Sequence, residues 1–400
     1  MEDLRKLEYL PEPSDRSILS AVDPTVLDFQ SEWRSEVMGW APLTVEPVVQ
    51  THSSGRSLSG IVLFAILVSA SLFLWQNQWA VLTLPLPDSE WAFEEVGIRE
   101  LQEVGLSGKN VRVCMVDTGI DSSHEAFNGK SIAFKDFVGT SVTPVDYGAV
   151  AHGTLMAGIL LSSTHQIGTA PNVTFAMAAA LQDNGEGENT GLDTDVADAI
   201  RWCQFDFGAD IISLSLGGTE SFGEGASSAA TRQATDAGVF VVAAAGNDGL
   251  NDDGDVATPG SVALAISVGA TIKQGEIWEN SSIGAALNPD GGPRQFPHQK
   301  PEVVAPGHRI ISTGEDNLWY SSSGTSDSTV LVVGALALIL EAHPVFKPKV
   351  DGNSSCLILV KQALADSSML ENQTGHDERY GYGKLQAKKW RDHVEEIETC

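Results

Sequence analysis

Positive charge is scarce in this sequence. Its 400 residues include 24 lysines and arginines against 53 aspartates and glutamates, a formal net charge of −29. A surface with this balance repels phosphate backbones and anionic lipid headgroups, so we expect no nucleic-acid partner. Acidity of this kind indicates a strongly solvated surface and does not by itself identify an active site.

Cysteine is also scarce, and its positions follow no recognisable spacing. The four residues are Cys114, Cys203, Cys356 and Cys400, with no Cys-x-x-Cys pair among them. This spacing predicts neither a zinc site nor a disulfide framework. Because Cys114 falls within an apolar run, we expect it to be a buried thiol.

Charge is missing altogether from Leu58 to Trp75, a mostly apolar stretch long enough to cross a bilayer. Arg56 precedes it and Trp79 follows it, as expected for a span whose N-terminal side faces the cytoplasm. A cleaved signal peptide would begin closer to the N-terminus. We therefore expect a single-pass protein of the cell membrane. Its parts would be a cytoplasmic tail (1–57), a transmembrane anchor (58–79), an extracellular domain (88–390) and a C-terminal tail (391–400).

From Trp91 onward, continuous apolar runs alternate with helical patterns. Strands are predicted at 111–116, 173–179, 211–216, 239–244 and 264–268, with an edge strand at 303–304, and helices at 151–161, 195–204, 226–237 and 330–340. Strands that are apolar throughout predict a mostly parallel sheet covered on both faces, a three-layer α/β/α domain. In such a sheet the functional site lies off the carboxyl ends of the strands.

Three polar residues stand at such positions. Asp117 ends the first strand, His152 opens the next helix, and Ser326 stands in Gly324-Thr325-Ser326 ahead of the apolar helix. Each alone fits a turn or helix-cap residue. Together they form the set that nucleophilic catalysis needs: a hydroxyl, an imidazole to take its proton, and a carboxylate to orient the imidazole.

A fourth residue, Asn247, follows a strand of small residues in Ala243-Ala244-Ala245-Gly246-Asn247. Its amide NH₂ could donate to an oxyanion, although a turn asparagine would look the same.

These motifs, in the order Asp-Thr-Gly, His-Gly-Thr, Ala-Ala-Gly-Asn and Gly-Thr-Ser, resemble the subtilisin-like serine proteases. The resemblance runs from about Trp91 to about Lys389. It implies that Asp117 orients the imidazole of His152, that His152 is the general base, and that Ser326 is the nucleophile. It also implies that Asn247 and the Ser326 N–H form the oxyanion hole, and that no cofactor is required.

The resemblance further implies a polypeptide substrate held in extended form by main-chain hydrogen bonds. One substrate edge would be Ser215, Leu216 and Gly217, and a strand around Gly185 and Gly187 would lie on the other side. Ala245 and Gly246 would wall a roomy apolar pocket, with Asp248 at its rim, where it could accept a basic side chain.

The sequence departs from the family at three positions. Asp327 replaces the usual Met after the nucleophile, Val330 replaces a Pro, and Leu155 replaces a His. A carboxylate at Asp327 could raise the pKa of His152 and move activity to higher pH. A structural calcium ion would find oxygen ligands in the acidic turn Asn251–Asp255.

The function expected from these features is that of a membrane-anchored serine endopeptidase whose catalytic domain faces outward. One alternative is a catalytically silent binding domain on the same fold, for which Asp327 and Val330 leave room. Another is a hydrolase of esters, which would have no use for two strand-like substrate edges.

Overall fold

The computed structural model describes Ser69, residues 87–218, 225–249, 254–288, 291–350, 352–369 and 375–398, and Cys400. A seven-stranded sheet runs through this part of the chain in the order β2-β3-β1-β6-β7-β8-β9, and every neighbouring pair is parallel. Its strands are β1 (Arg112–Asp117), β2 (Ile132–Asp136), β3 (Thr174–Ala179), β6 (Ile211–Leu214), β7 (Phe240–Ala244), β8 (Ile266–Thr271) and β9 (Val303–Pro306). The prediction of a parallel sheet is confirmed.

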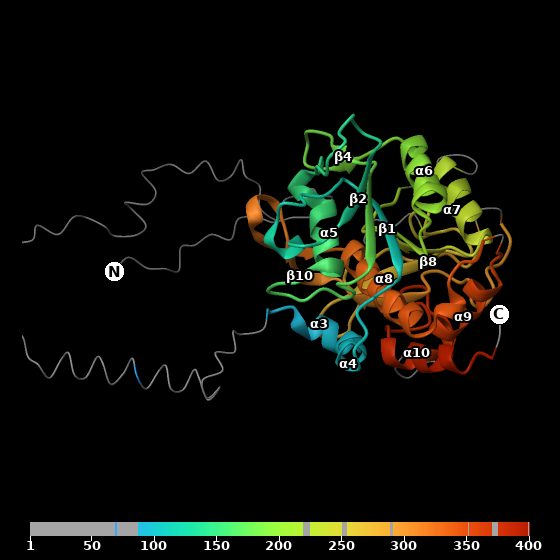
Figure 1. Ribbon diagram of the computed structural model, residues 1–400. Coiled ribbons are helices and arrows are strands. Elements are labelled where there is room, and N and C mark those ends of the chain that lie inside the picture. Colours follow the sequence, from blue (N-terminus) through green and yellow to red (C-terminus); the bar gives the residue numbers. More distant parts are fainter. Residues whose placement is uncertain are drawn as a thin grey trace, which may run out of the picture. The chain divides into compact units, whose positions relative to one another are not determined.

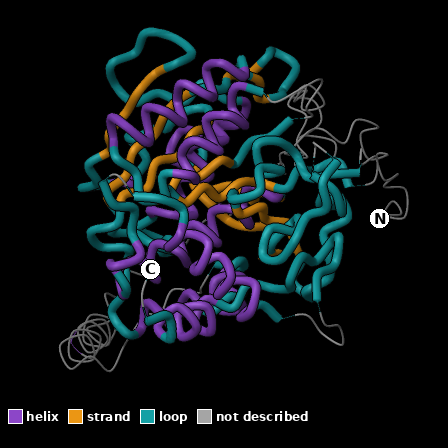
Figure 2. Tube along the Cα trace, turned by 90° about the vertical axis from the view of Figure 1, so that its right-hand side faces the viewer, coloured by secondary structure: helices purple, strands orange, loops and turns teal. Residues whose placement is uncertain are grey.

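Helices cover both faces of this sheet, so that the domain has three layers (Figures 1 and 2). One face packs against α5 (His152–Leu161), α8 (Thr325–Ala342), α9 (Ser355–Ser367) and α10 (Ala387–Glu395). The other packs against α6 (Asp193–Trp202) and α7 (Ala226–Asp236). Side chains alternate along each strand, so Val113 and Met115 of β1 enter the first core and Val116 the second.

The long apolar helix α8 crosses the first core with its residues from Thr325 to Leu340 buried. It is the one described helix long and apolar enough to cross a membrane, and 89% of it is buried within the domain. We therefore assign it as a core helix of the sheet domain. The stretch predicted to span the membrane, Leu58–Trp75, lies outside the described residues except for Ser69.

Several elements have no counterpart in the sequence prediction. Two antiparallel hairpins stand apart from the main sheet: β4 (Gln182–Asp183) with β5 (Asn189–Thr190), and β10 (His308–Thr313) with β11 (Trp319–Ser323). The short helices α3 (Glu90–Glu95) and α4 (Ile98–Glu103) precede β1, and α6 continues into a π-helical turn, Cys203–Phe207. Helix α10 continues through the boundary expected at residue 390, with Trp390 and Val394 buried. Single 3₁₀ turns lie at Glu125–Phe127, Ala149–Ala151, Glu315–Asn317 and Pro344–Phe346.

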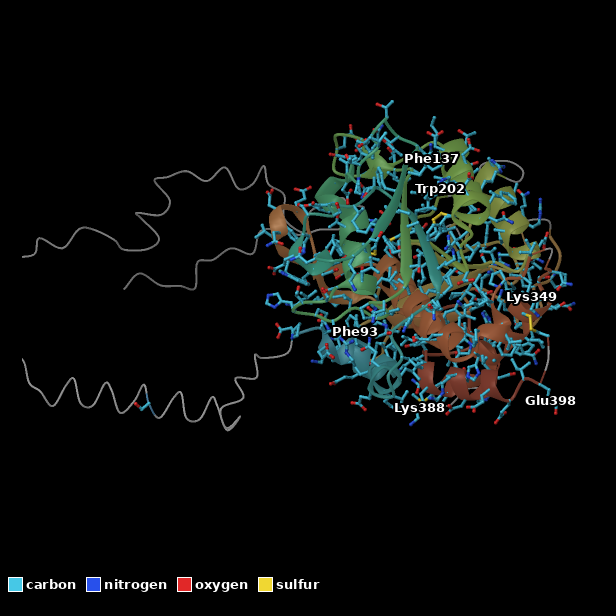
Figure 3. All side chains as sticks on the ribbon, in the orientation of Figure 1. Phe93, Phe137, Trp202, Lys349, Lys388 and Glu398 are labelled. Carbon is cyan, nitrogen blue, oxygen red and sulfur yellow. A yellow bond between two sulfur atoms is a disulfide. The ribbon has the colours of Figure 1, made fainter. Side chains whose placement is uncertain are left out.

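The cysteine prediction was wrong. All four residues form disulfides, visible in Figure 3 as yellow bonds. Cys114 of β1 bonds to Cys203, whose Cα atom lies 5.7 Å away, and Cys356 of α9 bonds to Cys400 at a Cα–Cα distance of 4.9 Å. The two cysteines of each disulfide are 89 and 44 residues apart in the sequence, so no short spacing motif indicates the pairing. The fold brings them within the distance that a disulfide requires.

Candidate active site

Three of the predicted residues lie where the main chain enters or leaves the sheet layer. Asp117 is the last residue of β1, His152 the first of α5, and Ser326 the second of α8. All three are buried. The N–H groups of the first turn of α8 have no helical partners, so the positive end of the helix dipole lies at Ser326 and favours negative charge there.

Asp117 and His152 form a direct pair. His152 Nδ1 lies 2.8 Å from Asp117 Oδ1, and the same oxygen accepts the N–H of Thr118 at 2.7 Å. Asp117 is fully buried and His152 is 5% exposed. This is the contact by which a carboxylate fixes the tautomer of an imidazole and stabilises its protonated form.

Three carboxylates act on the pKa of His152. Burial alone would lower it, but the charge and hydrogen bond of Asp117, with the charges of Asp327 and Asp146, outweigh burial and raise this pKa from 6.5 to about 9. The direction agrees with the effect expected of Asp327 from the sequence. The imidazole is therefore mostly protonated at neutral pH, and its basic form gains population as the pH approaches 9.

Asp327 is itself buried beside the nucleophile. Its Oδ2 accepts the hydroxyl of Ser322 from β11 at 3.1 Å, whereas its Oδ1 is buried with no hydrogen-bond partner. Burial raises the pKa of this carboxyl from 3.8 to about 7, against the Ser322 hydrogen bond and the charge of His152. The pKa values of these two neighbouring groups, about 7 and about 9, therefore lie close together.

Ser326 is held against the segment that follows β6. Its hydroxyl donates to the carbonyl oxygen of Ser215 at 3.2 Å, and the Ser215 hydroxyl donates to the Ser326 carbonyl at 3.2 Å. The Ser326 hydroxyl thus does not point its proton at His152 in this conformation. Catalytic hydrogen bonds are often poorly aligned before substrate binds, and a rotation about χ1 would redirect the proton.

The amide of Asn247 has a defined orientation. Its Oδ1 accepts the N–H of Thr325 at 3.0 Å and the Thr325 hydroxyl at 2.9 Å. A main-chain N–H can only donate, so the oxygen must face Thr325 and the NH₂ group must face the other way. The NH₂ group of Asn247 therefore points away from Thr325, and its orientation is fixed before a substrate oxygen arrives, as an oxyanion donor requires.

The remaining predicted pocket residues pack against small side chains. A Cβ atom added to Gly217 or Gly246 would meet the side chain of Ala257, and one at Gly246 would also meet Ser282. Gly246 has φ +111°, which an L-residue adopts only with strain. Ala245 is fully buried behind it. These glycines therefore let the main chain pack closely against Ala257 and Ser282.

The prediction of a strand around Gly185 and Gly187 was wrong. Both glycines are exposed in the turn that joins β4 to β5, with φ of +84° and +87°. The Asn184 N–H closes this turn by donating to the Glu188 carbonyl. Glycines in left-handed conformation favour a tight turn over an extended edge.

Two acidic residues of the predicted pocket rim and calcium turn, Asp248 and Asp255, have side-chain partners within the domain. Asp248 is exposed and accepts the hydroxyl of Ser282. Asp255 forms a two-pronged ion pair with Arg294 at 2.7 and 2.8 Å, and the rest of the predicted calcium turn at 251–253 lies outside the described residues. The described residues contain no group of three or more His, Cys, Asp or Glu side chains that could hold a metal ion.

Two residues with a place near the site were missed in the sequence. Asp146 is half-buried and accepts hydrogen bonds from Thr118, next to Asp117, and from Thr154, two residues after His152. Asn189 accepts the main-chain N–H of Ala149, three residues ahead of His152. The one available signal was a carboxylate six residues before His152 in a loop of small residues.

Comparison with known proteins identifies the family of this chain. A model of the subtilase family matches residues 108–383. Subtilisin NAT from Bacillus subtilis subsp. natto is 31% identical over 258 residues, which cover 64% of this chain and 61% of that protein. Subtilisin DY from Bacillus licheniformis is 33% identical over 253 residues, covering 61% of this chain and 82% of that protein. The chain thus spans 61% of the length of the first of these relatives.

Solved structures show the same fold. The prenylagaramide maturation protease PagA superposes with a TM-score of 0.58 at 24% sequence identity, covering 74% of this chain and 98% of that one.

Proposed function

Because the chain belongs to the subtilase family, we propose that it is a serine endopeptidase that acts through Asp117, His152 and Ser326. The observation that carries the proposal is the buried pair of His152 Nδ1 and Asp117 Oδ1, 2.8 Å apart. The imidazole is buried and bonded to a carboxylate, and it lies at the same end of the sheet as a serine in the first turn of a helix. This arrangement is typical of a base that takes a proton from a serine nucleophile.

The proposed chemistry uses side chains and water. Once its hydroxyl turns from Ser215, Ser326 Oγ attacks the scissile carbonyl carbon while His152 Nε2 takes the hydroxyl proton. The imidazolium then gives this proton to the leaving nitrogen, the C–N bond breaks, and the acyl group remains on Oγ. A water molecule repeats the sequence, with its proton passing to His152, and releases the acid.

Two donors would stabilise the negative charge that develops on the substrate oxygen. They are the NH₂ group of Asn247, whose orientation Thr325 fixes, and the N–H of Ser326 at the start of α8. Donors that are already oriented cost little reorganisation when the charge appears.

The proposed substrate is an extended polypeptide. Its main chain would lie along Ser215, Leu216 and Gly217, and the side chain before the scissile bond would lie beside Ala245 and Gly246. The small residues there favour apolar side chains. A basic side chain could reach Asp248, which is exposed at the rim. A structural calcium ion at the turn 251–255 remains a prediction.

We also propose that the domain lies outside the cell, anchored by a helix over Leu58–Trp75 with the N-terminus in the cytoplasm. The two disulfides support an external location, because such bonds persist in oxidising compartments and are rare in the cytosol. Deletion of residues 1–79 should release a soluble protein. Continued membrane association of that variant would contradict the single anchor.

A silent binding domain is the alternative that one observation favours, namely the Ser326 hydroxyl bonded to Ser215. Labelling with a serine-reactive fluorophosphonate, followed by peptide mapping, separates the two. We expect labelling at Ser326 in the full-length protein and none in His152→Ala. A folded protein that does not react would favour the silent domain. Peptide and ester substrates with the same acyl group would then test for an esterase.

A further inference from the structure

The segment from Asp146 to Ala151, called the strap below, leads directly into His152 and is strained. Val150 and Ala151 have φ of +52° and +50°, in the left-handed region that residues with a Cβ atom seldom adopt. The cost is greatest for a β-branched residue such as Val150. A conformation of this kind persists only where its surroundings hold it in place.

One end of the strap is held by Asp146. Its Oδ1 accepts the Thr118 hydroxyl at 2.6 Å and the Gly148 N–H at 2.9 Å. Its Oδ2 accepts the hydroxyl and the N–H of Thr154 at 2.6 and 2.8 Å. The Thr118 hydroxyl oxygen in turn accepts the N–H of Gly153 at 2.8 Å.

The sequence positions of these partners matter. Thr118 directly follows Asp117, and Gly153 directly follows His152. One carboxylate therefore fastens the chain after Asp117 to the first turn of α5, across the pair that the site depends on. This bonding leaves no acceptor atom of Asp146 idle.

The other end of the strap is held by the hairpin β4–β5. Asn189 of β5 accepts the Ala149 N–H on its Oδ1 at 2.7 Å, next to the strained residues. The Asp183 N–H of β4 donates to the Tyr147 carbonyl at 2.9 Å. The strap is thus bridged between the hairpin and the two chain ends that carry Asp117 and His152.

We propose that Asp146 and Asn189 are positioning residues that hold the strained strap and thereby fix His152 against Asp117. The inference rests on the proposed function, because it takes His152 as the base for Ser326. A displacement of about 1 Å in a catalytic group can cost roughly 10²-fold in rate, so a small relaxation of the strap would be visible in kcat. A role in stability alone would leave the kcat of the folded molecules unchanged.

The test is a set of variants of the full-length protein assayed with one peptide substrate. Asn189→Ala removes the acceptor for Ala149 and should lower kcat about 10-fold, with KM changed less than about twofold. Asn189→Asp keeps an oxygen in reach of that N–H and should return kcat to within about threefold of wild type. Asp146→Asn places an NH₂ group against donors and should cost more than Asn189→Ala.

A matched control is Asn353→Ala. Asn353 also accepts a main-chain N–H on Oδ1, that of Ser355 at 3.0 Å at the start of α9, in a part of the chain unconnected with the strap. Its loss should affect stability and leave kcat unchanged. Active molecules are counted in each variant by titration with the fluorophosphonate, so that misfolded protein does not enter kcat.

The outcomes separate the inference from its premise. A kcat of Asn189→Ala equal to that of Asn353→Ala, an effect confined to KM, or a failure of Asn189→Asp to recover would each overturn the inference alone. A wild-type protein that is folded and does not react with the fluorophosphonate would overturn the proposed function, and the inference with it.

Discussion

Two groups of charged side chains lie at opposite ends of the sheet strands. Carboxylates predominate in the first group and lysines in the second. The first, the site cluster, lies at the carboxyl ends and consists of the buried Asp117, His152 and Asp327 with the half-buried Asp146. The second, the lysine cluster, lies at the amino ends of β8 and β9 and consists of Lys300, Glu302 and Lys361.

In the lysine cluster, two cations share one anion. The Nζ atoms of Lys300 and Lys361 lie 2.9 and 2.7 Å from Glu302 Oε1, and both donate to the Ala265 carbonyl. Burial lowers the pKa of both lysines, and nearby cations add to this effect against the charge of Glu302. We assign this cluster a structural role, because it closes the sheet end and all three side chains are buried.

In the site cluster, three carboxylates surround one imidazole. Burial lowers the pKa of the base here as it does in the lysine cluster, yet the pKa of His152 rises, because three carboxylates act on one imidazole, whereas Lys300 and Lys361 share the single carboxylate of Glu302. The comparison teaches that burial alone does not set the direction of a pKa shift. The direction depends on whether the carboxylates around a buried base together outweigh burial and nearby cations.

The largest effect should come from removing the proposed nucleophile, Ser326, which lies at the same end of the sheet as the site cluster. Ser326→Ala should reduce peptide hydrolysis by roughly 10⁴-fold or more, as known for triad residues in subtilisin, without loss of thermal stability. The hydrolysis rate and the melting temperature, measured on the same sample, check the predicted loss of activity and the predicted retention of stability. Wild-type activity in this variant would rule out Ser326 as the nucleophile.

The second effect should appear at the lysine cluster and in stability only. Glu302→Gln leaves two buried ammonium groups without their anion, which we expect to cost about 3–5 kcal/mol of unfolding free energy. Chemical denaturation measures this cost. The kcat of the remaining folded molecules should match wild type, and a large fall in that kcat would mean that the two clusters are coupled.

A third change removes the amide that faces Thr325. Asn247→Ala should lower kcat by about 10²–10³-fold, the size known for the oxyanion donor of subtilisin, with little change in KM. Steady-state kinetics on one peptide substrate give both constants. An effect found only in KM would mean that Asn247 binds substrate in the ground state.

The smallest effect concerns Asp327, and it tests directly whether neighbouring carboxylates raise the pKa of His152. Asp327→Asn removes one negative charge from His152, so its pKa should fall and the rise of kcat/KM with pH should begin about 0.5–1 pH unit lower. A pH–rate profile measures the shift. An unchanged profile would show that Asp327 does not act on the imidazole.

The same variant has a stability effect with a definite sign. The pKa of Asp327 is raised on folding from 3.8 to about 7, so its stabilising contribution is complete below pH 3.8 and is lost as the pH rises through about 7. Asp327→Asn should therefore gain stability over wild type mainly above pH 7, by roughly 1–3 kcal/mol. His152 follows the same rule at higher pH, losing its contribution between 6.5 and about 9.

The sequence was most informative where residues are apolar and consecutive. The runs that became β1, β3, β6 and β7 could be located because a strand buried on both faces is apolar throughout. β2 (Ile132–Asp136) was missed because it is an edge strand, only half-buried, and carries Lys135. A run of apolar residues indicates a strand that is buried on both faces, and the edge strand β2 is only half-buried.

Partnerships between distant residues could not be predicted in the same way. The pairing of Cys114 with Cys203 depends on β1 meeting the end of α6, which no spacing encodes. The bonds of Asp146 and Asn189 depend on loops whose polar residues have no period. Asp117, His152 and Ser326 could be located because each stands at a strand end or helix start, and the family resemblance assigned their roles. The structure adds the 2.8 Å distance between His152 Nδ1 and Asp117 Oδ1.

The most direct test of the account is the rate at which the fluorophosphonate labels Ser326, measured against pH. If the buried, carboxylate-bound imidazole of His152 activates this serine, the labelling rate should rise with pH through an apparent pKa near 9 and vanish in His152→Ala. A labelling rate independent of pH, or one that survives His152→Ala, would contradict the claim that His152 is the base.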